Sequence, residues 1–558
     1  MDLQRTLLIG AIAVVGVFTL RQWNDDYHSR APSPDDAIVS SSSSVNQASD
    51  KHRADIPVSS TTEIASNHII GESHSLIKVK TDALNVSIDP VGGNIVNLSL
   101  PQYPAYLPKK GEVAPDFQLL VNHPELFSKD ATKTYVAQSG FINTDSRGKA
   151  VYNIRQGTYK LKDGEDSIVV DLFRNDKGID ITKRYVFERG SYDVKLDYIV
   201  KNNTQTSWKD RFYAQLKRDG SEDPSRKNSN APMNTYLGAA VKSNEKNYQK
   251  LPFDEFSKEP LRESVQGGYA AMLQHYFVTA WVPDQQTSHD YYTNTTQSDG
   301  ENYYFVGFQN LIEVKPDSTV QVSATLYAGP KLQDNLKSLA DGLELTVDYG
   351  ILWFLAQPIF KLLHWIQSFI GNWGWSIILL TVVVKAVFYP LNATSFRSMA
   401  KMRKLGPKMQ SLKEQYADDK QKLSQAMMTL YKKEKVNPMG GCLPILVQMP
   451  VFIALYWVLQ ETVELRQAPW LLWIEDLSQM DPYFILPLIM GASMFLQQML
   501  NPTPPDPTQA KVMKLMPVIF TFFFLWFPAG LVLYWVTNNT LSIIQQYIIT
   551  RRLEVESN

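Results

Sequence analysis

The chain has 558 residues, a formal net charge of −1 at pH 7 and one cysteine, Cys442. This length exceeds what one ordinary hydrophobic core supports, and the near-neutral charge gives no global preference for nucleic acid. A single cysteine excludes an intrachain disulfide framework and a multi-cysteine metal site. Apolar residues gather in the last third of the sequence, which predicts a multi-domain membrane protein with a large soluble part.

The first 23 residues carry the pattern of a membrane anchor. Arg5 precedes an apolar run over 7–20, and bulky residues such as Trp23 follow the run. A cleaved signal peptide, which is the alternative, would end in small residues. We therefore expect a transmembrane signal anchor over 1–23. Residues 24–75 are polar and serine-rich, which predicts a disordered tether.

Residues 76–330 have the pattern of a β-sheet domain. Apolar and charged residues alternate in the segments 168–172 and 192–198, a period of two that is typical of half-buried antiparallel strands. Glycine-containing turn signals at 91–94 and 175–178 separate such segments. We expect one large all-β sandwich without a long helix.

Residues 331–371 are expected to link this domain to a membrane core. The first half has a helical pattern. In the apolar second half, Lys361, His364 and Gln367 fall on one edge of a helix. Such an amphipathic helix suits the membrane interface better than its interior.

Residues 372–550 contain several apolar segments, each able to cross a hydrocarbon layer of ~30 Å with some tilt or thinning. The expected spans are about 374–391, 441–460, 483–500, 512–527 and 529–549.

Charge predicts the orientation of these spans. Residues 394–435 contain eleven Lys and Arg against four Asp and Glu, whereas Arg466 is the basic residue of the acidic loop 463–482. Loops rich in Lys and Arg remain on the cytoplasmic side of the membrane. The first loop is therefore expected in the cytoplasm and the second outside. Both termini and the loop 501–511 then lie in the cytoplasm, and the β-domain lies in the periplasm.

The basic loop 394–435 has the pattern of a helical hairpin made of two amphipathic helices. Methionines lie among its basic residues. They fit ordinary packing between the helices, or an adaptable apolar surface for nascent chains or ribosomal protein.

A family resemblance rests on residues 350–550. The sequence segments on which the resemblance depends are NWGWSIILLTVVVKAVFYPL, MAKMRKLGPKMQ, EKVNPMGGCLPILVQMPVFIALY, VELRQAPWLLWIEDLS and MPVIFTFFFLWFPAGLVLYWVTNNTLSIIQQ. They resemble the YidC/Oxa/Alb family of membrane-protein insertases, and the β-domain with its tether resembles the Gram-negative type.

This resemblance implies a five-span α-helical insertase core, a cytoplasmic hairpin and a periplasmic β-supersandwich. It implies a bacterial inner-membrane protein that inserts, folds and helps assemble membrane proteins, alone or with the Sec translocon. The implied partners are nascent membrane proteins, Sec components, lipids and the ribosome, the last through the hairpin and the loop 501–511. No specific nucleic acid is expected.

The sequence carries no motif for bond-making chemistry. We find no G-x-x-x-x-G-K-[ST], no H-E-x-x-H and no G-x-S-x-G. We therefore expect no enzyme activity, no catalytic residue, no cofactor and no metal site.

Polar residues at membrane depth are the informative positions. Lys385 lies in the first span, with Thr381 four residues earlier on the same helix face. A charge there is costly and faces protein or water, unless it snorkels to the headgroups. The resemblance places a positive residue, typically arginine, in a hydrophilic groove open to cytoplasm and lipid. Compared with arginine, lysine keeps the positive charge but lacks the planar set of hydrogen-bond donors of a guanidinium. We therefore expect an electrostatic role at Lys385.

Gln448 lies between two prolines of the next span. Its amide could bond a backbone group freed by proline, whereas the resemblance assigns it to the groove.

The resemblance also assigns contact with the entering substrate helix to a set of large side chains. For each of these side chains taken alone, ordinary core packing or lipid contact is the alternative to substrate contact. Trp535 departs from the common second tyrosine, and an aromatic-belt position is its alternative role. The set is Phe452, Met490, Phe523, Tyr534 and Trp535.

A different class of function stays open from the residues alone. A polytopic transporter or channel with a periplasmic carbohydrate-binding or sensor domain would share the overall pattern. It would favour inverted repeats and discontinuous helices, and the five expected spans show no such repeat.

Overall fold

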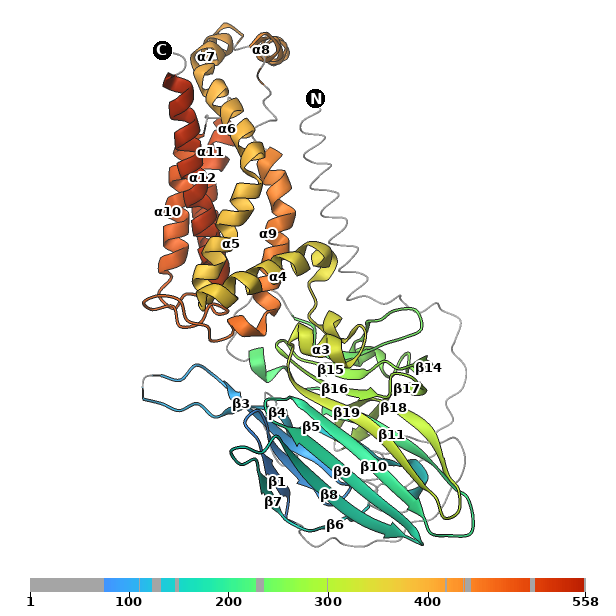
Figure 1. The fold of residues 1–558 in the computed structure, drawn as a ribbon. Helices are drawn as coiled ribbons and strands as arrows, with labels where there is room; N and C mark the ends of the chain where they lie inside the picture. Colours follow the sequence, from blue (N-terminus) through green and yellow to red (C-terminus); the bar gives the residue numbers. More distant parts are fainter. Residues whose placement is uncertain are drawn as a thin grey trace, which may run out of the picture. The chain divides into compact units, whose positions relative to one another are not determined.

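The computed structural model describes residues 75–109, 111–122, 132–145, 150–226, 235–298, 300–416, 419–434, 436, 443–501 and 507–555. The expected anchor over 1–23 lies outside these residues, and so does the expected tether apart from its last residue. The described chain begins with a β-sheet region and continues as a helical region (Figure 1).

The β-region is built from two sheets. Within the described residues, the first has ten strands, in the order β14 (Arg262–Gln266), β17 (Ser288–Ser298), β18 (Glu301–Val314), β11 (Trp208–Asp219), β5 (Thr134–Phe141), β4 (Asp116–Asn122), β3 (Asn94–Pro104), β2 (Asn85–Asp89), β1 (Ile77–Lys80) and β7 (Thr158–Lys160). On the same basis the second has nine, in the order β13 (Gln249–Leu251), β12 (Gly238–Val241), β15 (Ala270–Leu273), β16 (Phe277–Pro283), β19 (Thr319–Pro330), β10 (Asp193–Asn202), β9 (Ile179–Glu188), β8 (Ser167–Asp176) and β6 (Asn153–Ile154). Within the described residues, neighbouring strands pair antiparallel, except β1 with β7, which pair parallel.

The alternation in the sequence sets the buried face of these strands. Val194, Leu196 and Tyr198 of β10 are fully buried, while the charged residues between them are not. Strands β8 and β9 are joined through Lys177 and Gly178, whose φ angles are 52° and 89°. Two successive positive φ angles suit the tight turn of a two-residue hairpin. The predicted antiparallel strands are confirmed here.

The two sheets pack against each other as a sandwich. Hydrogen bonds cross between them: Trp281 Nε1 donates to the carbonyl of Gln215 at 3.0 Å, and the Tyr198 hydroxyl donates to the carbonyl of Ser139 at 2.9 Å. Buried residues of both sheets belong to one hydrophobic core. The predicted all-β sandwich is therefore confirmed, with one short helix, α2 (Ile142–Asp145), inserted after β5.

The helical region follows β19. Its helices are α3 (Gln333–Leu339), α4 (Trp353–Ile370), α5 (Trp373–Val387), α6 (Tyr389–Lys404), α7 (Gly406–Gln415), α8 (Lys420–Lys433), α9 (Leu443–Glu461), α10 (Ile485–Leu500), α11 (Pro507–Phe523) and α12 (Ala529–Val555). Helix α3 is shorter than the helix expected over the first half of 331–371, and a 3-10 turn, Leu343–Thr346, follows it.

Two breaks divide segments that were expected to be continuous helices. Helix α5 ends at Val387, and α6 starts with Pro390 in its first turn, bent by 69° from α5. The basic segment is divided again before Pro407, where α7 begins. Proline explains both starts, since it lacks the amide hydrogen that a helix interior needs. Helices α7 and α8 then contact each other through the Lys408–Glu434 ion pair at 2.7 Å.

Among the described residues, no single helix is both long and apolar enough to cross a membrane, and the bent pair α5 and α6 meets these length and composition criteria only when the two helices are taken together. Helix α4 coincides with the helix expected at the membrane interface, and Lys361 and His364 of its predicted polar edge are exposed. Its place at the interface stays a prediction. Ala356 and Leu363 are buried on one face, while Trp353, Trp365 and Phe369 are exposed.

Candidate functional site

A polar cluster joins three helices of the helical region. Lys385 of α5 donates through Nζ to Ser542 Oγ of α12 at 2.8 Å, and its Nζ lies 3.5 Å from Gln448 Oε1 of α9. Gln448 Nε2 donates to Asn538 Oδ1 at 2.7 Å. Lys385, Gln448 and Asn538 are half-buried, so the cluster is neither sealed in the core nor freely exposed. We call these four residues the Lys385 cluster.

Helix α12 supplies half of this cluster because its polar residues recur every four positions. Tyr534, Asn538 and Ser542 therefore share one helix face. The Ser542 hydroxyl donates to the carbonyl of Asn538 at 2.8 Å, which leaves its oxygen free to accept from Lys385. Asn538 and Ser542 were not among the residues predicted for this site, although their four-residue spacing from Tyr534 was a usable signal.

Thr381 is placed differently from the other two predicted groove residues. It is fully buried, and its hydroxyl donates to the carbonyl of Ile377 at 2.7 Å. This bond satisfies the hydroxyl within its own helix. The structure thus brings Lys385 and Gln448 together and leaves Thr381 in the packed interior.

An aromatic cluster lies beside Gln448. Phe452, four residues further along α9, packs edge-on against Trp535 with ring centres 4.4 Å apart, and stacks on Tyr534 at 6.3 Å. Trp535 also meets the buried Phe524 at 5.4 Å. Three of the predicted contact residues, Phe452, Tyr534 and Trp535, therefore pack together next to the Lys385 cluster. Tyr534 is fully buried, whereas Phe452 and Trp535 are half-buried, and we call these two rings the aromatic surface.

The two other predicted contact residues do not join this surface. Met490 of α10 has no exposed surface, so it packs in the interior. Phe523 is 53% exposed, and its ring meets that of Phe527 at 4.9 Å. The structure therefore places the five predicted contact residues in three different environments.

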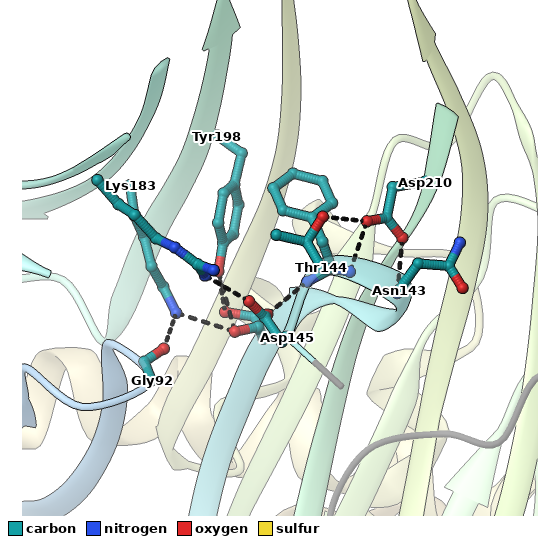
Figure 2. A network of polar contacts seen from close by, with 10 residues as sticks. Gly92, Asn143, Thr144, Asp145, Lys183, Tyr198 and Asp210 are labelled. Carbon is teal, nitrogen blue, oxygen red and sulfur yellow. Dashed lines mark hydrogen bonds and ion pairs between the residues drawn. The ribbon is translucent and has the colours of Figure 1, made fainter. Parts of the chain in front are cut away.

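A second polar network lies inside the β-region (Figure 2). Lys183 of β9 is fully buried and donates to the carbonyls of Gly92 and Ser139, at 3.2 and 3.1 Å. Burial lowers the pKa of the Lys183 amine to about 7, because an apolar site disfavours its charged form. Nearby, Asp145 pairs with Arg174 at 2.7 Å.

Asp210 completes this network. Its carboxylate accepts from the backbone amides of Asn143 and Thr144, both at 2.9 Å, and from the Thr144 hydroxyl at 2.6 Å (Figure 2). These bonds hold the first turn of α2 against β11. Most groups of this network are buried, and they bond to each other or to backbone groups, as buried polar groups generally do. The network thus ties α2 and β9 into the interior of the sandwich.

Metal binding has no evident centre in the part of the chain that the structure describes. No group of three or more His, Cys, Asp or Glu residues lies close enough together there to hold an ion.

Comparison with known proteins identifies both regions. Residues 76–362 match the family described as the YidC periplasmic domain, and residues 365–556 match the 60Kd inner membrane protein family. A protein of Pseudomonas putida strain F1, named membrane protein insertase YidC, is 51% identical over 569 residues, covering 99% of both chains. A protein of the same name from Azotobacter vinelandii strain DJ is also 51% identical over 569 residues, with the same coverage.

The chain belongs to the YidC family of membrane protein insertases. It is an inner-membrane protein, its β-sandwich is a periplasmic domain, and its function is membrane-protein insertion. Membership decides against the transporter or channel considered from the residues alone. A solved crystal structure of an active YidC insertase is similar over 86% of this chain and 93% of its own, at 18% identity and a TM-score of 0.37.

Proposed function

We propose that the Lys385 cluster is the polar end of an insertion path that opens to the cytoplasm and to lipid. The observation that carries this proposal is the half-buried Lys385 amine, held at 2.8 Å by Ser542 of a second helix and facing Gln448 of a third. A cation held by polar groups among apolar helices is costly, which suggests a use for it.

The physical difficulty of insertion explains what this cluster would do. A polar segment that crosses ~30 Å of hydrocarbon must lose its water, which costs several kcal/mol for each unpaired polar group. Polar side chains within the helix bundle replace part of that water and shorten the dry path. The Lys385 cation attracts acidic residues of the passing segment, and this attraction is strongest where water is scarce.

The aromatic surface would guide the apolar part of the substrate. Phe452 and Trp535 lie next to the polar cluster, so a segment with a polar tail and an apolar body can meet both surfaces at once. The apolar body then leaves sideways into lipid. Its burial supplies the driving force at ~25 cal/mol per Å² of apolar surface, and no bond is made or broken in the substrate.

The orientation belongs to this proposal. We place the start of α5 on the periplasmic side, because Trp373 lies shortly after residues 76–362, which match the periplasmic domain. The basic helices α7 and α8, the loop 501–511 and both termini are cytoplasmic, since positive segments stay inside. Exposed basic residues on α7 and α8 suit contact with a ribosome that delivers nascent chains. Cooperation with Sec components and chaperone activity are further parts of the proposal.

A charge substitution tests the role of Lys385. Lys385→Ala should impair insertion of single-span substrates with acidic translocated tails most and those with neutral tails least, whereas Lys385→Arg should retain insertion. Lys361→Ala, which removes an exposed lysine from α4, is the matched control and should leave both substrates unaffected. Equal insertion of all substrates by the Lys385→Ala variant would exclude the electrostatic role.

Two deletions test the assigned domain roles. Removal of residues 76–320 should preserve insertion of a small single-span substrate, because the β-domain is accessory in this account. A collapse of insertion while the helical core still folds would contradict that role. Removal of residues 394–435 should reduce co-sedimentation with ribosomes, and unchanged co-sedimentation would contradict the ribosome contact.

A further inference from the structure

The loop between α9 and α10 ends in a small apolar tip. Leu472 is 84% exposed, more than any other leucine in the part of the chain that the structure describes, and its neighbour Leu471 is 42% exposed. Leu472 also has a φ of 55°, in the left-handed region that a leucine rarely adopts. The backbone therefore holds a large apolar side chain outward, in a conformation that the residue itself disfavours.

Hydrogen bonds fix the shape of this tip. The Trp470 amide donates to the carbonyl of Ile474 at 2.9 Å, and the Ile474 amide donates to the carbonyl of Leu471 at 3.1 Å. The Ile474 side chain is buried. The segment 470–474 is thus a closed turn with an anchored base, and the exposure of its two leucines does not arise from a loose loop.

Helix α5 holds the base of the turn. The Trp470 ring lies against Gly374, where an added Cβ would come within 2.2 Å of Trp470 Cδ1. Trp470 also meets Trp375 edge-on, with ring centres 5.8 Å apart. In addition, Asn372 Nδ2 donates to the carbonyl of Pro469 at 3.1 Å. The tip is therefore fixed beside the first turn of α5.

The exposed apolar face of α5 leads to this tip. Trp375, Leu379 and Val382 recur at intervals of four and three residues, so they share one helix face, and all three are exposed. In the proposed orientation this face meets lipid, and its Trp375 end is periplasmic. The two leucines continue the same apolar surface through Trp470.

We propose that the turn 470–474 is a rigid wedge that inserts Leu471 and Leu472 among the acyl chains of the periplasmic leaflet. Lipid suits this tip better than a protein partner does. Stable protein interfaces bury about 800 Å² on each side, far more than two leucines present. Acyl chains accept any apolar side chain without shape complementarity. The wedge would anchor the periplasmic end of α5 and disturb lipid packing beside it.

Fluorescence quenching tests the wedge, which rests on the proposed orientation of α5. In a Cys442→Ser background, single cysteines replace Leu472, Leu379 or Lys177, and each carries an environment-sensitive fluorophore. The full chain is reconstituted in phospholipid vesicles that contain lipid brominated along the acyl chain, or in plain vesicles with iodide on both sides. Lys177, an exposed turn residue of the β-domain, is the aqueous control, and Leu379 is the lipid control.

The labels at 472 and 379 should lose fluorescence in brominated lipid, and the label at 177 should lose it with iodide. If brominated lipid quenches the label at position 379 while only iodide quenches the label at position 472, the wedge is wrong and the proposed span stands. If 379 does not respond to brominated lipid, the proposed span itself is wrong. A label at 472 that neither quencher reaches would mean that a protein covers the tip, which also overturns the wedge.

Discussion

Lys385 Nζ lies 2.8 Å from Ser542 Oγ, although the two residues are 157 positions apart in the chain. Ser542 is buried and donates its own hydrogen to the carbonyl of Asn538 at 2.8 Å. Its oxygen is therefore oriented as an acceptor for the amine. The position of the cation thus depends on α12 as much as on the helix that carries it.

Removal of this acceptor should weaken insertion without unfolding the protein. In Ser542→Ala, Lys385 loses its closest acceptor in the described structure, and one lost hydrogen bond of this kind costs about 1 kcal/mol. That corresponds to about a fivefold loss. We expect this loss for substrates with acidic tails, in an insertion assay with reconstituted protein, and recovery in Ser542→Thr. Thr540→Ala is the control, because its exposed hydroxyl bonds only the Val536 carbonyl among the described contacts, at 2.8 Å. Equal losses in both alanine variants would refute the specific role of Ser542.

Gly374→Ala should destabilise the helical core. The new Cβ would lie 2.2 Å from the Trp470 ring, and overpacking of this kind costs about 1–3 kcal/mol. A lower thermal unfolding midpoint of the purified protein in detergent would show it. Gly406→Ala is the matched control, since no described atom lies within 4 Å of the position where its Cβ would sit. If both variants unfold at the wild-type temperature, the Trp470 contact is not as close as the structure shows.

Lys183 should make the stability of the β-domain depend on pH. Its pKa falls from 10.5 to about 7 on burial, so between these values the unfolded chain binds a proton that the folded chain does not. Stability therefore rises with pH in this window, and the contribution of the neutral amine is lost as the pH falls through about 7. The difference in free energy of unfolding between wild type and Lys183→Met should widen in favour of wild type from pH 7 to pH 9. A difference that stays constant over this range, measured by denaturant unfolding of the full chain, would contradict a lowered pKa.

The sequence predicts some of these features for clear physical reasons and misses others. The burial of Val194, Leu196 and Tyr198 follows from a period of two, because strand side chains point to opposite faces in turn. The helical region lacks such contrast. In an almost uniformly apolar helix nothing local fixes its rotation, so Met490 and Phe523 look equivalent in sequence, yet one is fully buried and the other is exposed.

The candidate site shows the same limit. Lys385 and Gln448 stand out because polar residues are rare in apolar helices. Ser542 is marked only by its spacing from Asn538 and Tyr534, because a serine commonly bonds its own helix. Its contact with Lys385 depends on how α5 and α12 pack. Thr381 shares a helix face with Lys385, but neighbouring helices cover it.

The most direct test of the insertion path is photo-crosslinking to a stalled nascent chain. A photoreactive phenylalanine analogue replaces Phe452, beside the Lys385 cluster, or Phe495, an exposed residue of α10 outside it. Analogues at 385 and 448 extend the map. We predict that a ribosome-bound substrate with a single apolar segment crosslinks at 452, 448 and 385, and not at 495. Crosslinks at 495 equal to or stronger than those at 452 would contradict the account.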